Sequence, residues 1–458
     1  MSHLITPLAF IFILGSTVVL HEFGHFIVAK LFGIRVETFS VGFGPRLFGR
    51  RWGHTDYRVS AIPLGGYVKL GGDESNAPLE GASAPDIPEK EMFNLRPRWQ
   101  RIMVALAGPV MNILTAFTIP FVAALMYGVP VSPAPIVSYV APAGAAEKAG
   151  LKSGDRIVSF NGTDNPDWDT IEGDGLLSPD QDLPLVVDRG GERVRLSIRP
   201  TPHTENGETG GMLDFRPDNG GYPVVVGTVS PGSPAAEAGL QPGDRLLSID
   251  GESVKSAAHG KGYIRDHNGQ VIHLTILRNG ETKELTTGVR RLDNGVLGFT
   301  VGDEFPLRRA KPGASAAYAY QFNVNIVRLT SKALGQVFTG KRSVSNTLSG
   351  PIGIYRAAST QVERLGWDGV YQMIGFLSLN LGIFNLLPIP VLDGGAIFLL
   401  LIEGALGLIG LTLSLTVRER IQQVGFVVVI LMMVFVLAND VLKLTHRSSD
   451  SKPAATSK

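Results

Sequence analysis

The stretch LITPLAFIFILGSTVVLHEFGHFIVAK, residues 4–30, decides how this chain is organised. Before His21 it carries no charged side chain, and after His25 the apolar pattern continues to Lys30. About 20 mostly apolar residues suffice to cross a bilayer as a helix. We therefore predict a transmembrane helix at residues 1–32, retained in the protein because the start lacks the basic segment of a signal peptide.

Two histidines and a glutamate interrupt this apolar helix as His21-Glu22-x-x-His25. Residues four apart lie on one helix face, about 6 Å apart along the axis, so both imidazoles can bind one zinc ion. Glu22 lies beside a ligand and can act as general base on a zinc-activated water. The alternative is a polar helix face packed in a bundle, although ionisable groups within a membrane are usually functional.

Composition limits the chemistry further. The 458-residue chain has a formal net charge of +1 and no cysteine. The balanced charge predicts no nucleic-acid partner. Because thiolate ligands are excluded, any zinc has to be held by histidine and carboxylate.

Residues 33–101 are rich in lysine and arginine, which predicts a cytoplasmic loop and puts the histidine end of the first helix on that side. Polar and apolar residues alternate in 35–41, 57–62 and 67–70, which predicts strands. An exposed sheet edge there could hold a substrate extended for cleavage. The alternative is a hairpin with no substrate role. Residues 73–95 have the composition of a mobile linker.

A second apolar span is predicted at residues 102–127 and contains Asn112. Its side chain could hydrogen-bond toward the zinc site, or could serve only in packing between helices. The last span is predicted at residues 421–443, followed by a disordered tail at 444–458.

The polar middle of the chain contains a repeat. Residues 142–162 match residues 231–251 without a gap, so that Gly150 aligns with Gly239. Two copies predict two tandem domains, at 130–210 and 215–300, rather than a solenoid. Each copy predicts a short helix, a glycine turn, a strand and a tight turn.

Residues 303–368 follow the repeats and predict an amphipathic helix within 316–337. This helix is expected near the outer membrane surface, or as a soluble helix packed on the repeats. The segment 349–353, which contains two glycines and a proline, predicts a break in the secondary structure of this region.

A third span is predicted at residues 369–407, and Pro388 and Pro390 must break or bend it. Asp393 follows that break. With two neutral histidines, Asp393 as third ligand and Glu22 nearby would balance the charge of zinc, as a low-dielectric site favours. The alternative is that Asp393 merely caps a helix.

The repeated block, A-x-x-A-G-L-x-x-G-D, resembles PDZ domains of bacterial membrane and periplasmic proteases. That resemblance implies two small β-sandwiches that bind peptide C-termini by strand addition, or that act only as a steric filter. Together with His21-Glu22-x-x-His25 and Asn385-x-x-Pro388-x-Pro390-x-x-Asp393-Gly394, the chain resembles the site-2 protease family of intramembrane zinc proteases, particularly its bacterial RseP branch.

The family resemblance implies a polytopic α-helical membrane protein. It would have four transmembrane helices, a membrane-associated β-hairpin sheet and two tandem PDZ-like domains. It implies that His21, His25 and Asp393 bind Zn²⁺ and that Glu22 is the catalytic base and acid. It implies substrate-binding roles for residues that contact or align the substrate backbone, namely Asn385, Tyr67, Val68 and Lys69.

The resemblance also implies location and partners. The site would lie near the cytoplasmic face of the bacterial inner membrane, with the PDZ-like domains on the periplasmic side. The substrates would be single-span membrane proteins already shortened by another protease, such as an anti-sigma factor, and remnant signal peptides. The alternatives are an inactive membrane-anchored PDZ module that gates another protease, or a transporter, which should show inverted hydropathy repeats.

Overall fold

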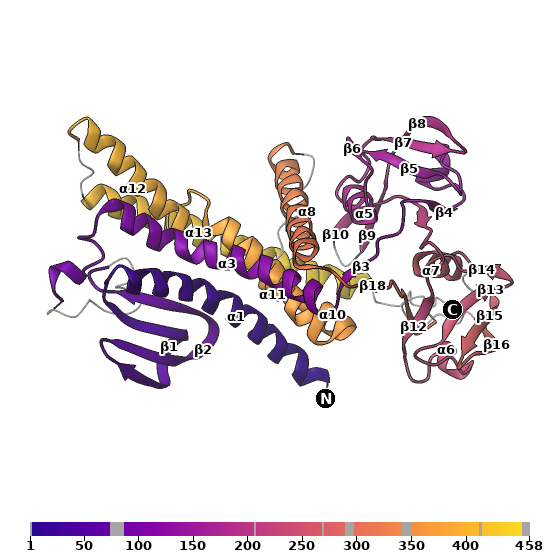
Figure 1. The fold of residues 1–458 in the computed structure, drawn as a ribbon, viewed down its shortest axis with the longest axis horizontal. Coiled ribbons are helices and arrows are strands. Elements are labelled where there is room, and N and C mark those ends of the chain that lie inside the picture. Colours follow the sequence, from indigo (N-terminus) through magenta and orange to yellow (C-terminus); the bar gives the residue numbers. More distant parts are fainter. Residues whose placement is uncertain are drawn as a thin grey trace, which may run out of the picture. The chain divides into compact units, whose positions relative to one another are not determined.

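The computed structural model describes residues 2–73, 87–205, 208–267, 270–288, 297–340, 350–411 and 415–450. The chain forms two compact units (Figure 1). The first, called here the helical unit, comprises Met1–Met126, Ala310–Val327 and Ser343–Lys458. The second, called the repeat unit, comprises Tyr127–Arg309 and Arg328–Arg342.

Long apolar helices build the helical unit. Among the described residues, three helical segments are long and apolar enough to cross a membrane, at Thr6–Leu31, Arg98–Met126 and Gln423–Asp440. They belong to α1 (Ser2–Leu31), α3 (Arg98–Met126) and α13 (Leu415–Asp450).

The third predicted span, 369–407, is divided into α11 (Trp367–Asn385) and α12 (Asp393–Leu408). The break between them falls at the two prolines, as expected. Because α12 has only 16 residues, it is shorter than the length of about 20 that a simple crossing needs.

The helix α13 is longer than the predicted span 421–443 and continues to Asp450. The first part of the predicted disordered tail is therefore helical, because no glycine or proline between residues 444 and 450 ends the helix. The remainder of the tail, residues 451–458, lies outside the described residues.

The strands β1 (Val36–Trp52) and β2 (Thr55–Leu70) form one antiparallel sheet (Figure 1). Both strands fold back on themselves, so the segments lie side by side in the order 66–70, 36–41, 56–60 and 46–52. Gly42 reverses the direction of β1 with a φ of +93°, a conformation that favours glycine. The predicted strands are confirmed, as parts of two longer folded strands.

This sheet packs on the helices that carry the candidate site. Val36, Val68 and Leu70 share a buried cluster with Ala29 of α1 and Val104 of α3. The cluster fixes the strand segment 66–70 beside the C-terminal half of α1.

The predicted linker 73–95 is only partly described. Residues 74–86 lie outside the described residues, whereas 87–95 pack on the sheet. Ile87 is buried and Glu91 pairs with Arg35 at 2.8 Å, so this second part is held in place by burial and charge rather than mobile.

The amphipathic region contains α8 (Pro312–Phe338) and α10 (Pro351–Leu365). The first confirms the helix predicted within 316–337. The second begins directly after Gly350, within the predicted break. Residues 312–327 of α8 belong to the helical unit and residues 328–338 to the repeat unit.

In the repeat unit the sequence repeat is also a structural repeat. The first copy contains β4 (Val137–Val140), α4 (Ala145–Lys148), β5 (Arg156–Phe160), β6 (Thr163–Asp164), α5 (Trp168–Leu176), β7 (Leu183–Arg189), β8 (Glu192–Ile198) and β11 (Phe215–Pro217). The second contains β12 (Val224–Val229), α6 (Pro234–Glu237), β13 (Arg245–Ile249), β14 (Glu252–Ser253), α7 (Ala257–Asp266), β15 (Val271–Arg278), β16 (Glu281–Gly288) and β17 (Phe299–Asp303). Each copy has its own hydrophobic core, around Phe160 and around Ile272 respectively.

Short strands complete the repeat unit. The hairpin β9 (Thr201–Glu205) and β10 (Glu208–Met212) precedes β11, and β3 (Val129–Pro130) pairs with β18 (Leu307–Arg308). In the second copy, β17 is an edge strand of its sheet, in the order β16-β15-β13-β12-β17.

Candidate metal centre

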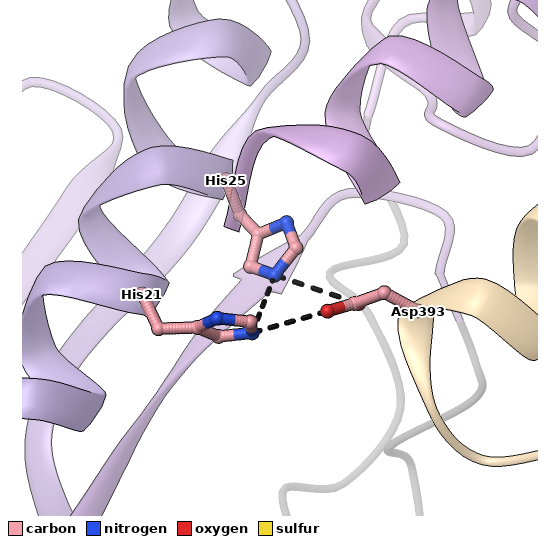
Figure 2. Close-up of side chains that lie close together, drawn as sticks. All are labelled: His21, His25 and Asp393. Carbon is pink, nitrogen blue, oxygen red and sulfur yellow. Dashed lines mark hydrogen bonds and ion pairs between the residues drawn. The ribbon is translucent and has the colours of Figure 1, made fainter. Parts of the chain in front are cut away.

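Three predicted ligands from two distant parts of the chain meet in the helical unit. His21 and His25 lie on α1, and Asp393 is the first residue of α12 (Figure 2). Nε2 of His21 lies 3.1 Å from Oδ2 of Asp393, and Nε2 of His25 lies 3.5 Å from Oδ1. The two Nε2 atoms are 3.2 Å apart.

These separations fit a single zinc ion. Zinc bonds to histidine nitrogen and carboxylate oxygen of about 2.0–2.2 Å in a tetrahedron place neighbouring ligand atoms about 3.3–3.6 Å apart. The three observed separations, 3.1, 3.2 and 3.5 Å, lie close to that value. Water or substrate oxygen would be the fourth ligand, as in catalytic zinc sites.

The helix α3 orients both imidazoles through their other ring nitrogen. Nδ1 of His25 lies 2.8 Å from the main-chain carbonyl of Val104. A carbonyl only accepts, so Nδ1 carries the proton and Nε2 keeps its lone pair for a metal.

His21 is held in the same way by Asn112. Its Nδ1 lies 3.2 Å from the amide of Asn112, whose side chain is fully buried. Oδ1 of Asn112 has no hydrogen-bond partner when the amide nitrogen faces His21. Turning the amide over gives Oδ1 the Nδ1–H of His21 and leaves Nε2 free for a metal. The structure thus favours the predicted role of Asn112 as a hydrogen-bond partner of the zinc site over a role in helix packing alone.

Two glycines let α1 and α3 approach closely enough for these contacts. A Cβ on Gly24 would collide with the backbone of Ala107, and a Cβ on Gly108 would collide with the imidazole of His25 and approach Cε1 of His21 to 2.8 Å. In the sequence, the signal for this role of Gly108 is the Gly108-Pro109 pair one helical turn before Asn112.

The break before α12 directs Asp393 toward α1. Leu392, not Asp393, is the N-cap residue of α12, so the capping alternative does not describe the Asp393 side chain. Val391 has a φ of +88°, a strained conformation for a β-branched residue. Gly394 has no room for a Cβ against the carbonyl of Leu386. The strained, tightly folded segment therefore sets the position of the carboxylate.

Glu22 lies between the histidines and the sheet. Its carboxylate accepts a hydrogen bond from the backbone N–H of Val68 in β2. A Cβ on Gly66 would lie 3.7 Å from Cγ of Glu22. The predicted base and the predicted substrate strand are thus direct neighbours.

Of the predicted substrate-binding residues, some lie at the candidate metal site and others are directed elsewhere. Nδ2 of Asn385, at the end of α11, lies 3.3 Å from Nε2 of His21. Tyr67 stacks on Phe43, and Lys69 pairs with Glu37 at 3.2 Å. Asn385 and Val68 therefore lie at the site, whereas the Lys69 ammonium is directed to another strand of the sheet.

Two histidines and an aspartate around one point, with a glutamate next to a ligand, define the class of zinc metallopeptidases. A sequence profile of peptidase family M50 matches residues 9–432. The chain belongs to peptidase family M50.

Named relatives agree with this assignment. The regulator of sigma-E protease RseP of Escherichia coli K12 is 32% identical over 469 residues, covering 95% of this chain and 98% of that protein. The protease RseP of Yersinia pestis is 33% identical over 476 residues, covering 97% and 100%. A Neisseria meningitidis protein named for zinc metalloprotease activity is 34% identical over 474 residues, covering 96% and 99%.

The family and the apolar helices make the protein a membrane-integral, zinc-dependent metalloprotease that cleaves within membrane segments. The predicted family, activity and cofactor are confirmed.

Proposed function

We propose that His21, His25 and Asp393 hold the catalytic zinc ion, and that the protein uses it to cut single-span membrane proteins within their membrane segment. The observation that carries this proposal is the convergence of the three ligand atoms, with Glu22 beside them. Bound there, zinc would supply a Lewis acid that activates a water and polarises the scissile carbonyl.

Glu22 performs the proton transfers. It removes a proton from the attacking water and delivers it to the nitrogen of the leaving amine. The Val68 N–H holds its carboxylate beside the histidines, where both transfers can occur. A polar path must bring water from the cytoplasm to this site.

The edge of β2 aligns the substrate. A helical substrate has to be extended before its backbone can be cut, and the segment Tyr67-Val68-Lys69 offers a strand edge beside Glu22. The proximity of Asn385 to His21 supports a hydrogen bond from its amide to the substrate backbone. The Glu37–Lys69 pair suggests that Lys69 stabilises the strand and contributes its backbone rather than its charge.

The chain crosses the membrane four times, at α1, α3, the pair α11 and α12, and α13. Irregular backbone is tolerated at membrane depth when protein covers it, and Gly425 of α13 packs against Pro390 in the break. The basic residues of 33–101 favour a cytoplasmic position for this segment and for the site. Both termini and the repeat unit then lie on the periplasmic side of the inner membrane.

The substrates are of the anti-sigma factor type, first shortened by another protease, together with remnant signal peptides. Support comes from the relatives named as regulators of sigma-E and from the family resemblance. The two repeats act as PDZ-like domains, either as a size filter or as readers of peptide C-termini. The edge strand β17 supports the role of the second repeat as a reader of peptide C-termini, because an extended peptide could add to this edge.

The competing function is an inactive membrane-anchored binding module. The presence of His21, Glu22, His25 and Asp393 opposes it. The test uses purified protein in detergent micelles with a single-span substrate that has either a short or a long periplasmic end. The cleavage position is mapped by mass spectrometry.

Wild-type protein should cut the short-ended substrate within its membrane segment, whereas Glu22→Gln should bind zinc equally well and not cut. Preference for the short-ended substrate supports the role of the two repeats as a size filter. If both proteins bind zinc and neither cuts, the binding module is the better description.

A further inference from the structure

The outer strand of the β1–β2 sheet, residues 46–52, exposes large apolar side chains. Trp52 is 80% exposed, Phe48 64% and Leu47 63%. Such a concentration of exposed apolar surface marks an interaction site in a stable protein.

The position of this strand relative to α1 identifies what it faces. Lys30, the charge that ends the apolar run of α1, donates a hydrogen bond of 2.8 Å to Oγ1 of Thr55. Thr55 is the direct cross-strand partner of Trp52. Trp52 is therefore level with the end of the membrane-spanning helix, where tryptophan side chains gather in membrane proteins.

The other end of the sheet reaches deep along the same helix. A Cβ on Gly15 would lie 3.7 Å from the carbonyl oxygen of Pro63. Fifteen residues separate Gly15 from Lys30, which is about 22 Å along a helix axis. The sheet thus extends alongside α1 through membrane depth, so its exposed outer strand continues the lipid-facing surface of the helices.

Two arginines on this strand lack an acidic partner. Arg50 and Arg51 are exposed, and no carboxylate in the described part of the chain pairs with either of them. The neighbouring carboxylates already have cationic partners: Glu37 pairs with Lys69, Asp56 with Arg46, and Glu91 with Arg35. The strand therefore presents two positive charges without an acidic partner, Arg50 on the face of the sheet that carries Trp52 and Arg51 on the opposite face.

We propose that Arg50 and Arg51 bind the phosphates of anionic phospholipids from the two faces of the outer strand, while Trp52 and Phe48 insert into the lipid layer on the Arg50 face. Guanidinium groups bind phosphate in a two-pronged geometry, and basic residues beside a membrane attract anionic headgroups. Lipid binding would hold the outer strand at the membrane surface and so stabilise the sheet whose opposite edge lies at Glu22. This proposal rests on the membrane setting and does not depend on the substrate or on catalysis.

The experiment uses full-length protein in nanodiscs of phosphatidylcholine alone or mixed with phosphatidylglycerol. Phosphatidylglycerol retained on the protein is counted by native mass spectrometry. The location of Trp52 is measured by quenching with phospholipids brominated on the acyl chain, in a variant whose other tryptophans, Trp99, Trp168 and Trp367, are phenylalanine. The charge variant is Arg50→Gln with Arg51→Gln.

The matched control is Arg193→Gln with Arg195→Gln, which removes two exposed arginines from β8 of the repeat unit. We expect Trp52 to be quenched. We also expect phosphatidylglycerol binding to weaken about fivefold for each arginine lost from the outer strand, and to stay unchanged in the control. Unchanged zinc content in all variants shows that the fold is intact.

Equal phosphatidylglycerol retention in wild type and the Arg50/Arg51 variant overturns the proposal, as does the absence of Trp52 quenching. A third result also overturns it: unchanged lipid retention with slower cleavage of a substrate that has an acidic cytoplasmic flank. In that case the arginines bind substrate.

Discussion

The main-chain carbonyl of Val104 accepts a hydrogen bond from Nδ1 of His25 at 2.8 Å. This contact joins α3 to the ligand helix α1 and fixes which imidazole nitrogen remains available to a metal. The site therefore depends on α3, although α3 supplies no ligand.

The helix α3 passes both imidazoles at Gly108, where there is no room for a side chain. We predict that Gly108→Ala lowers zinc affinity by at least about tenfold, because the new methyl group displaces both imidazoles. The measurement is zinc per protein after dialysis against a chelator. Gly404→Ala in α12 is the matched control, since a Cβ there meets nothing within 4 Å. Equal zinc retention by both variants would contradict the predicted crowding.

Asn112 should act as a positioning residue. Asn112→Ala removes the acceptor that orients His21, and loss of such outer partners typically weakens metal binding 10- to 100-fold. Competition with a chromophoric chelator measures the affinity. Asn380→Ala in α11 is the control, because it also removes a helix amide, one that donates a hydrogen bond of 2.9 Å to the carbonyl of Phe376. If Asn112→Ala binds zinc as wild type does, Asn112 serves only in helix packing.

The repeats contain a duplicated ion pair around a buried aspartate, which should make them acid-sensitive. Burial alone would raise the pKa of Asp155, but hydrogen bonds from Arg189 and from the Lys152 N–H outweigh it and hold that pKa below its ordinary value of 3.8. Asp244 is held in the same way by Arg278 and the Gln241 N–H. A lowered pKa in the folded state stabilises the fold above about pH 4, and this stabilisation is lost as the pH falls through the folded pKa.

The amide protection factors of the two repeats, which correct for the pH dependence of chemical exchange, should therefore decrease when the pH is lowered below 4. Asp155→Asn should accelerate exchange in β5 and β7 at neutral pH, with a loss of about 2 kcal/mol, because Arg189 is left without its charged partner but is partly exposed. The second repeat is the internal control. Equal acceleration in both repeats, or none, would show that the pair does not stabilise its own copy.

Asp440 on α13 caps the start of α10. Its carboxylate accepts hydrogen bonds from the N–H groups of Gly350, Ile352 and Gly353 at 3.0–3.2 Å. Asp440→Ala should destabilise the first turn of α10 by about 1–2 kcal/mol, as loss of a helix cap does. Faster amide exchange at residues 352–355 is the expected result. Unchanged exchange there would mean that water replaces the cap without cost.

Much of the site could be predicted because its chemistry is local. The spacing of His21 and His25 fixes a shared helix face, and the prolines before Asp393 predict the break that frees its carboxylate. The repeat likewise appears in the sequence as a constant offset and in the structure as recurring elements.

The outer partners could not be predicted because they depend on packing between distant segments. The Val104 contact uses a main-chain carbonyl, which has no sequence signal, and the role of Gly108 emerges only when α3 lies against α1. The path of β1 could not be predicted either. Glycines such as Gly42 and Gly44 are typical of strand ends, but in the structure they lie where β1 reverses direction and continues to Trp52.

The proposed zinc centre is tested most directly by X-ray absorption at the zinc edge of Glu22→Gln, which preserves the three proposed ligands. Zinc held by His21, His25 and Asp393 should amount to about one ion per chain and show nitrogen or oxygen neighbours at about 2.0–2.2 Å with the multiple-scattering signal of two imidazoles, and Asp393→Ala should retain less zinc. Absence of zinc from Glu22→Gln, or unchanged zinc content in Asp393→Ala, would contradict the proposed centre.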